Sequence, residues 1–244
     1  MVPILLIGCS RPVNLAYRYP PRHDLRYVWT IGSNTQTESR GESSSRSILM
    51  TLELDERLLS KNKLRYTVTA MRIEVDGIEE PNPAPIVVDY EVTPAGLTRL
   101  SGGALEGLPP IAGLAADLKI PLPAKPLRPG LQWNAPLKIE EPGIFLDLTG
   151  QGRLQGFELK DQRRLAILSI SRRGAVHTSE IVEKAAVRLE GTMSANAEVK
   201  FDIGRGIVVE SVSTSISTYR VSLPASAPTA KITVKLTSRI KLAA

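Results

Sequence analysis

A strict alternation of apolar and polar residues dominates the second half of the chain. From Val187 to Phe201 the odd positions carry only apolar residues or glycine, and the even positions carry only polar or charged residues. Successive side chains of an extended strand point to opposite faces, so this pattern places all the apolar side chains on one face. A helix would spread both kinds around its circumference. We therefore predict one long amphipathic β-strand.

The two segments that follow continue the pattern. Asp202 to Gly206 is a predicted hairpin turn whose glycines accept a positive φ. The return strand is expected from Ile207 to Ser222. Its predicted apolar face holds Val208, Val212 and Ile216, and its other face holds Ser211, Ser213, Ser215 and Ser217. A last strand, Lys231 to Leu242, alternates apolar residues with basic residues and threonines.

Shorter alternations fill the rest of the chain. Two strands, 25–31 and 48–54, are predicted on either side of a loop from Ser39 to Ser45. The apolar phase changes near Ala70, which indicates a β-bulge. In all we expect about ten or eleven antiparallel strands. The predicted fold is mainly β: one large, curved antiparallel meander sheet, a half-barrel or open barrel, with one short helix.

The helix is expected from Ile111 to Leu118, because apolar residues recur there at intervals of three and four. A further stretch, Thr178 to Ala186, fits either a helix or a strand. Six prolines between Pro109 and Pro129 mark either a linker or a long excursion from one sheet. We favour a single antiparallel β domain over 24–244, with a possible subdivision near 101–130.

The first ten residues place the only cysteine of the chain directly after an apolar run. Leu6-Ile7-Gly8-Cys9 resembles the lipobox of bacterial lipoproteins, in which the cysteine is acylated. The apolar run is about half the usual length and no Lys or Arg precedes it, which a start codon placed too late would explain. The alternative is a first β-strand with a buried free cysteine. On the lipobox interpretation, residues 1–8 are residual signal peptide and residues 9–23, which are polar and rich in proline, are a tether.

Residues with chemical reactivity are scarce. One cysteine and two histidines give no ligand spacing for a metal, and no nucleotide-binding motif is present. A hydrolytic triad needs a histidine base. We interpret His23, in the tether, and His177, in a basic loop after Arg172-Arg173, as solvated surface residues. We therefore expect no metal, no cofactor and no enzymatic activity.

Basic residues give the chain a net charge of +6. Lys231, Lys235, Arg239 and Lys241 share one face of the last strand, where they could contact an anionic partner such as a lipid headgroup or a wall polymer. The alternative is that this strand lies at a sheet edge, where lysines discourage aggregation. Aromatic residues make up only 5% of the chain and do not interleave with the basic ones, so we expect no nucleic-acid partner.

Three segments together resemble uncharacterised bacterial envelope lipoproteins made of meandering strands. They are the lipobox, the L-x-P-G-x-x-W motif from Leu127 to Trp133, and the stretch from Gly191 to Gly204. The strand count with a helix over the sheet is also similar to the half-barrel lipoprotein carriers of the bacterial periplasm, typified by the lipoprotein-sorting chaperones and the mycobacterial lipid-binding lipoproteins. The resemblance implies a protein on the periplasmic face of the cell envelope. Ser10, rather than Asp, after the cysteine suggests the outer membrane by the same resemblance.

Two functions remain open, since fold does not imply function. In the first, the sheet and the helix enclose an apolar groove that binds a lipid-like ligand. Its predicted lining is Gly191, Met193, Ala195, Ala197, Leu114 and Leu118. In the second, the domain is a non-catalytic structural or protein-interaction lipoprotein with a filled core, and the small residues lie where the helix packs closely.

Replacing the predicted anchor tests the lipobox. We expect Cys9→Ala in the full-length gene, with its true start restored, to release the protein from membranes, because stable tethering needs the acyl chains. Fractionation of cells into membrane and soluble pools measures the change. Unchanged membrane fractionation would rule the lipobox out.

Overall fold

The computed structural model describes residues 11–39, 41–80, 86–96, 98–102, 118–141, 144–182, 185–222 and 230–243. They form one thirteen-stranded sheet. Its strands are β1 (Asp24–Ser39), β2 (Glu42–Ser60), β3 (Lys63–Val75), β4 (Ile78–Glu80), β5 (Ile86–Val92), β6 (Thr98–Gly102), β7 (Gln132–Asn134), β8 (Leu137–Glu141), β9 (Ile144–Lys160), β10 (Arg163–Val182), β11 (Ala185–Asp202), β12 (Ile207–Ser222) and β13 (Ala230–Leu242).

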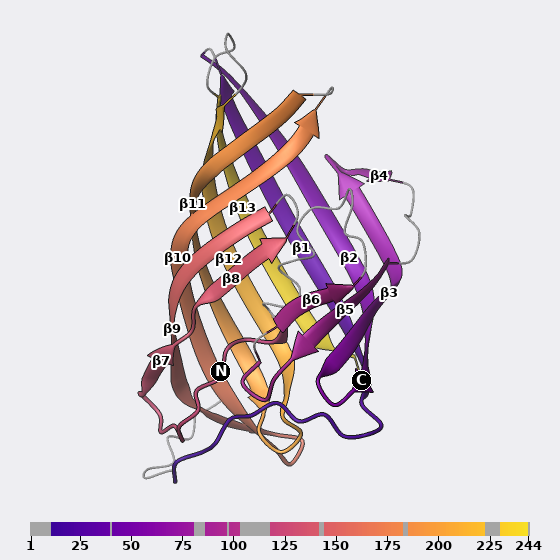
Figure 1. Cartoon of the computed structure of the whole chain (residues 1–244), viewed down its shortest axis with the longest axis vertical. Helices are drawn as coiled ribbons and strands as arrows, with labels where there is room; N and C mark the ends of the chain where they lie inside the picture. The colour runs from indigo at the N-terminus through magenta and orange to yellow at the C-terminus, as the bar shows by residue number, and fades with distance from the viewer. Residues whose placement is uncertain are drawn as a thin grey trace.

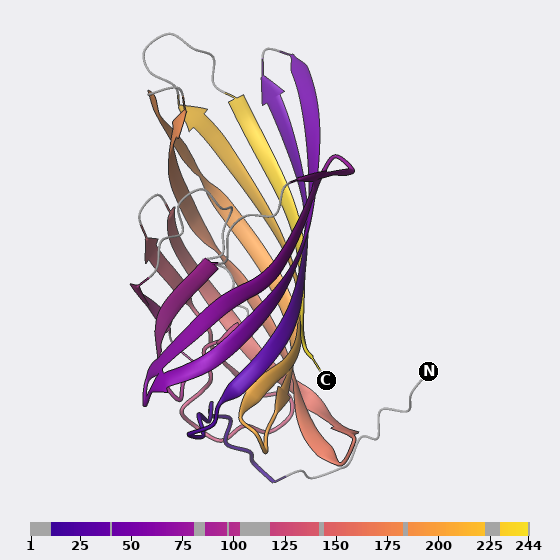
Figure 2. The same ribbon diagram turned by 90° about the vertical axis from the view of Figure 1, so that its right-hand side faces the viewer.

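The sheet is an antiparallel meander whose first and last strands pair with each other. Its order is β6-β5-β3-β2-β1-β13-β12-β11-β10-β9-β7, with β4 paired to β3 and β8 paired to β9. Figures 1 and 2 show the long strands curving around a concave side. This confirms the predicted fold class, a curved, open antiparallel sheet. We call the end with turns 161–162 and 203–206 the lower end, as in Figure 1, and the opposite end the upper end.

Burial confirms the alternation on β11. Val199 and Phe201 are buried, Ala195 and Ala197 are half-buried, and the even positions from 190 to 198 are exposed. The odd positions therefore face the concave side of the sheet and the even positions face the convex side.

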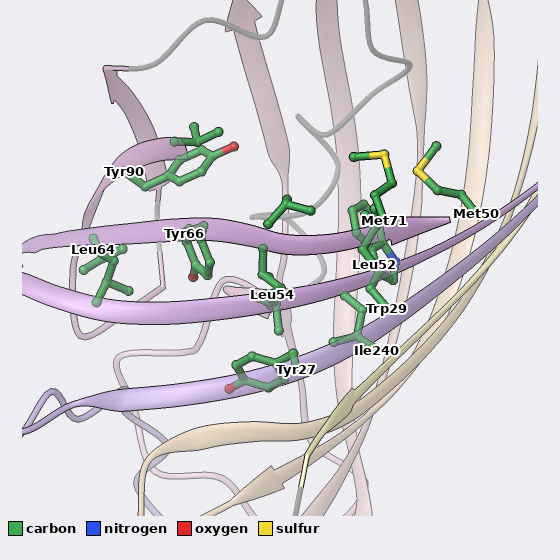
Figure 3. Close-up of a cluster of buried hydrophobic side chains, with 14 residues drawn as sticks. Tyr27, Trp29, Met50, Leu52, Leu54, Leu64, Tyr66, Met71, Tyr90 and Ile240 are labelled. Atoms are coloured by element: carbon green, nitrogen blue, oxygen red, sulfur yellow. The ribbon is translucent and has the colours of Figure 1, made fainter. Parts of the chain in front are cut away.

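A row of buried side chains crosses the sheet at the level of Val199. The pairing registers place one residue from each of eight neighbouring strands, β3 to β9 through the centre of the sheet, in this row. Its members are Met71, Leu52, Trp29, Ile240, Ser211, Val199, Leu168 and Leu154. We refer to them as the buried row; Figure 3 shows the part formed by Trp29, Leu52, Met71 and Ile240.

The hydrophobic core lies mainly between the buried row and the lower end. One cluster gathers Tyr27, Leu54, Tyr66 and other residues of β1, β2, β3 and β5, as Figure 3 shows. The second gathers Leu15, Tyr17, Ile120, Leu154, Phe201 and Val208 with their neighbours. Segments outside the sheet, near 11–23 and 118–127, thus cover its lower concave face.

Two β-bulges change which residues face inward. Thr69 has no partner in the register between β2 and β3, which confirms the bulge predicted there. Val209 is likewise unpaired between β11 and β12, and this shifts the phase of β12. Val208 consequently faces inward with the serines, while Val212 and Ile216 are 43% and 49% exposed. The predicted grouping of these three residues on one face is wrong.

The long hairpins extend further than predicted. β1 and β2 pair up to Ser39 and Glu42, so the expected loop from Ser39 to Ser45 is mostly strand. The described residues of Thr178–Ala186 are also strand. The predicted helix lies outside the described residues except for Leu118, which is buried. Among the residues that the structure describes, no helix has the length and apolar character to cross a membrane.

Paired substitutions on β11 test the faces assigned to this strand. We expect Val199→Asp to unfold the domain or severely destabilise it, because Val199 is fully buried in the buried row. Glu198→Ala, on the exposed face, should change the free energy of unfolding by roughly 0.5 kcal/mol or less. Thermal denaturation compares the two variants, and similar melting temperatures would mean that the strand register is wrong.

Candidate functional site

Above the buried row, the concave side chains of β11, β12, β13 and β1 are mostly half-buried, whereas those of β10 (Ile170, Arg172, Val176) and β9 (Leu146, Leu148) are buried. The half-buried residues of β11 include Gly191, Met193, Ala195 and Ala197, which are four of the six predicted groove residues. Their register partners on β12, β13 and β1 include many small or polar residues. The half-buried ones are Ser213, Ser215, Tyr219, Ile232, Val234, Leu236, Ile31, Ser33, Thr35 and Thr37. The half-buried part of the face is therefore of moderate polarity and several strands wide, with buried Ser217 and Ser238 within it.

Of the two remaining predicted groove residues, only Leu118 is described by the structure. Leu118 is fully buried in the cluster of Tyr27 and Trp29, whereas Ala197 packs against the second cluster. Gly191 lies eight residues above Val199, about 26 Å away at roughly 3.3 Å per residue. The structure thus does not bring Leu118 to the upper concave face, and Leu114 lies outside the described residues.

Gly191 has a backbone reason for lacking a side chain. A Cβ atom at this position would lie 2.1 Å from the carbonyl oxygen of Thr218 on the neighbouring strand. Close approach of the two strands therefore requires glycine, whatever lies on the concave side. The other small residues on that side are Ala195, Ala197 and the serines of β12.

A cationic side chain, Arg172, lies on the same face. It pairs in register with Ala195 on β11 and Gly150 on β9, and it is buried. Its Nε donates a hydrogen bond of 3.1 Å to the carbonyl oxygen of Ala135. Arg172 and His177 are both part of β10, so the predicted basic loop at this point is wrong.

A buried charge cluster lies on the lower concave face, under the segments that cover it. The carboxylate of Glu56 on β2 accepts hydrogen bonds from Lys119 Nζ at 2.8 and 3.0 Å and from Tyr66 OH at 2.6 Å. His23 Nε2 lies 2.5 Å from Glu56 Oε1. The exposed fractions of Glu56, Lys119 and His23 are 0%, 2% and 5%. An ionised carboxylate tolerates such burial only when it is paired in this way.

Aromatic rings enclose the cluster on the side of the N-terminal segment. Lys119 Nζ lies 5.1 Å from the ring centre of Tyr17 and 5.8 Å from that of Tyr19. The ring of Tyr19 meets that of His23 edge to face, at 5.4 Å between centres. Tyr17 OH donates to the carbonyl oxygen of Leu118 at 3.2 Å. These contacts fasten the N-terminal segment to the connection that carries Lys119.

This packing corrects two predictions. The described part of the expected tether, 11–23, contributes buried Leu15, Tyr17 and His23 to the core rather than running free in solvent. His23 is therefore no solvated surface residue. His177 is half-buried beside the ring of Phe145, at 5.5 Å between centres, and is not fully solvated either.

The charge of Glu56 is stabilised by its neighbours. Burial raises the pKa of the Glu56 carboxyl, but the Lys119 ammonium and the hydrogen bond from His23 outweigh burial and lower that pKa to about 2. Burial and then the Glu56 charge raise the pKa of Tyr66 well above its ordinary value. The carboxylate therefore stays ionised and the Tyr66 hydroxyl stays a hydrogen-bond donor at neutral pH.

Glu56 and Lys119 were not among the residues singled out from the sequence. The signal available was a break in pattern: Glu56 stands at an inward position of the series Met50, Leu52, Leu54. An acidic residue at an apolar phase indicates either a strand end or a buried partner. Lys119 follows buried Leu118 and has no strand periodicity to mark it.

The predicted basic face is on the convex side of a central strand. β13 pairs with β1 and β12, so the edge-protection interpretation is wrong. Lys231 lies 3.5 Å from Glu38, and Arg239 lies 2.6 Å from Glu210. Lys235 lines a surface cavity of about 420 Å³ with Gly32, Asn34, Leu49 and their neighbours. Neighbouring acids thus offset part of this positive charge, and the predicted anionic contact remains a prediction.

The parts of the chain that the structure describes hold no group of three or more His, Cys, Asp or Glu side chains that could bind a metal ion.

Comparisons with known proteins give a likeness of fold alone. The sequence matches no protein-family model and no curated protein. A solved structure titled "Lipid-protein interactions in lipovitellin" is similar over 93% of this chain, with a TM-score of 0.55 and 11% identity. This chain spans only 26% of that lipovitellin chain.

Two further solved structures are similar at a looser level. One is Salmonella typhi OmpF in complex with daunomycin, with a TM-score of 0.27, 7% identity, and coverage of 89% of this chain and 98% of that one. The other is a DUF1329 family protein from Desulfovibrio piger, with a TM-score of 0.17, 11% identity, and coverage of 87% and 84%. These TM-scores are too low to support an inference.

The charge cluster predicts a pH-dependent stability. The folded-state pKa of Glu56, about 2, lies below the ordinary value of 4.5. The carboxylate therefore stabilises the fold fully above pH 4.5 and loses this effect as the pH falls toward 2. We expect Glu56→Gln to cost about 3–5 kcal/mol at neutral pH, because Lys119 is left buried without its counter-charge.

The same substitution should flatten the acid limb of the stability curve. Chemical denaturation between pH 7 and 3 measures this for the parent, Glu56→Gln and Glu53→Gln, a control on the exposed face of the same strand. A parent and Glu56→Gln with parallel acid limbs would show that the buried carboxylate is not the titrating group.

Proposed function

We propose that this protein is a membrane-anchored lipoprotein of the bacterial envelope that binds an apolar, lipid-like ligand on the upper concave face of its sheet. The observation that carries the proposal is that burial along β11 ends at the buried row. Val199 in the row and Phe201 below it are buried, and above the row Ala195 and Ala197 stay half-buried although they face the concave side. Apolar surface left open on a concave face favours an apolar partner.

The residues above the boundary suit a chain-like ligand. Ala195, Ala197, Ser213 and Ser215 are small side chains that lie side by side on this face. Leu236 and Val234 of β13 supply apolar contact along the same rows. We propose binding rather than catalysis, with no cofactor.

The likeness to lipovitellin supports this proposal at the level of fold. That structure's title concerns lipid–protein interactions, and the matched part is a quarter of its chain. An open, curved sheet of this kind is compatible with holding lipid against its concave face, but the residues that would do so here are this chain's own.

The anchor part of the proposal rests on Cys9. The described chain begins two residues later, at Arg11, and its segment up to His23 packs against the lower end of the sheet. An acylated Cys9 would therefore hold the lower end toward the membrane and leave the upper concave face turned away from it. We propose the periplasmic side of the outer membrane as its location.

The second candidate function is a structural or protein-interaction lipoprotein whose concave face is filled by the protein itself. The observation that favours it is the close approach of β11 and β12 at Gly191, which explains this small residue without a ligand. Under this alternative the half-buried face takes no lipid.

A bulky substitution on the concave face separates the two functions. If the face is open, Ala195→Trp should leave the melting temperature nearly unchanged and abolish the lipid that co-purifies with the parent from its host. If the face is packed, overfilling should cost about 1–3 kcal/mol. Native mass spectrometry reads the lipid and thermal denaturation reads the stability.

Asn196→Trp is the matched control, since its side chain faces the convex side next to Ala195. It should change neither readout. A destabilised Ala195→Trp variant, together with a parent that carries no lipid, would leave the structural function standing and end the lipid proposal.

A further inference from the structure

A cavity of about 530 Å³ lies at the lower end of the sheet, apart from the upper concave face. It opens between the N-terminal segment, the start of β1 and the turn that joins β11 to β12. Its lining residues are Arg18, Tyr19, Pro20, Arg22, His23, Asp24, Leu25, Gly204, Arg205 and Ile207.

The charge around this cavity is strongly positive. Three arginines, Arg18, Arg22 and Arg205, are among its lining residues, and the acidic residue among them is Asp24. Asp24 Oδ2 itself lies 3.3 Å from the guanidinium of Arg57 outside the cavity. The cavity is therefore suited to an anion rather than to a neutral or cationic ligand.

Backbone contacts hold the two walls of the cavity together. Arg18 donates from its backbone N–H to the carbonyl oxygen of Gly206 at 3.1 Å, and from Nη1 to that of Gly204 at 2.9 Å. Gly206 has a φ of +68°, and a Cβ there would lie 2.6 Å from Arg18 Cγ. The turn is thus fitted closely against the N-terminal segment.

The turn that presents Arg205 is also fixed from within. Asp202, which is buried, accepts the backbone N–H of Arg205 at 2.9 Å through Oδ1. Arg205 therefore enters the cavity wall from a closed turn rather than from a long flexible loop.

We propose that this cavity binds a phosphate group. The planar guanidinium fork matches two phosphate oxygens at once, and three arginines lining one cavity suit a phosphate better than a single carboxylate. One of the five N–H donors of the Arg18 guanidinium binds the carbonyl oxygen of Gly204, and its other donors can bind a ligand. The cavity also has room for the carbon atoms of a phosphate ester beside the phosphate itself.

Two sources share this chemistry, a phospholipid headgroup and a small soluble phosphate ester. The test uses full-length protein carrying Cys9→Ala, so that no acyl chain contributes. Flotation with phosphatidylglycerol vesicles measures lipid binding, and glycerol 3-phosphate serves as a soluble competitor. Vesicles of an anionic lipid with a carboxylate headgroup separate phosphate recognition from charge alone.

We expect Arg22→Gln and Arg205→Gln each to weaken phosphate binding about fivefold, the effect of one guanidinium near an anionic surface. Arg153→Gln, an exposed arginine on β9, is the matched control and should bind like the parent. Arg18 is left unchanged because it holds the turn in place.

Displacement from vesicles by glycerol 3-phosphate would support recognition of the phosphate group itself. Vesicle binding without displacement would support the headgroup at a bilayer as the source of the phosphate.

Equal binding to carboxylate vesicles, or an equal loss in Arg153→Gln, would overturn the proposal in favour of general surface charge. Failure of the parent to bind either phosphate probe would overturn it outright. Neither result bears on the lipid proposed for the concave face, because Ala195→Trp leaves the three arginines untouched.

Discussion

The carboxylate of Glu56 joins three parts of the chain that are distant in sequence. It is held by His23 from the N-terminal segment, Lys119 from the connection before β7, and Tyr66 from β3. Burying a charge is unfavourable unless every partner is in place, so these segments have one arrangement that satisfies the carboxylate. Their attachment covers the lower concave face, and the antiparallel bridge between Val13 and Leu127 ties the same two segments together again.

The rest of the architecture depends on how much of the concave face the segments near 11–23 and 118–127 cover. The central strands are 13 to 20 residues long, and their concave side chains are buried up to the row of Trp29, Ile240 and Val199. Beyond this row the concave side chains of β1, β13, β12 and β11 are mostly half-buried, whereas Ile170, Arg172 and Val176 of β10 are buried. Because the strands continue past the core, part of their concave surface is accessible to a ligand. The small residues of β11 and β12 determine which ligand can bind to this surface. Function, on this account, depends on where the core ends.

The sequence predicted the strands well because alternation with period two reports directly which side chains share a face. It predicted faces less well across bulges: unpaired Val209 turns Val208 toward the serines, and no composition signal marks this extra residue. Strand order could not be predicted either, since nothing local shows that β13 pairs with β1.

The polar, proline-rich segment up to His23 resembled a tether in the sequence because its buried contacts, above all with Glu56, come from residues far along the chain. Of the candidate site, the small residues of β11 and the inward position of Glu56 can be read from the sequence, but the partners of Glu56 and the arginines of the cavity come together only in three dimensions.

Cysteine labelling across the buried row tests most directly whether the core ends there. Single cysteines are introduced by Ala195→Cys and Val199→Cys into protein carrying Cys9→Ala, and a water-soluble maleimide is added to the folded, delipidated protein. The account predicts fast labelling at position 195, slowed when co-purified lipid is retained, and labelling at position 199 only on unfolding. Equal protection of both positions in the delipidated protein would show that the chain itself fills the concave face, and would contradict the account.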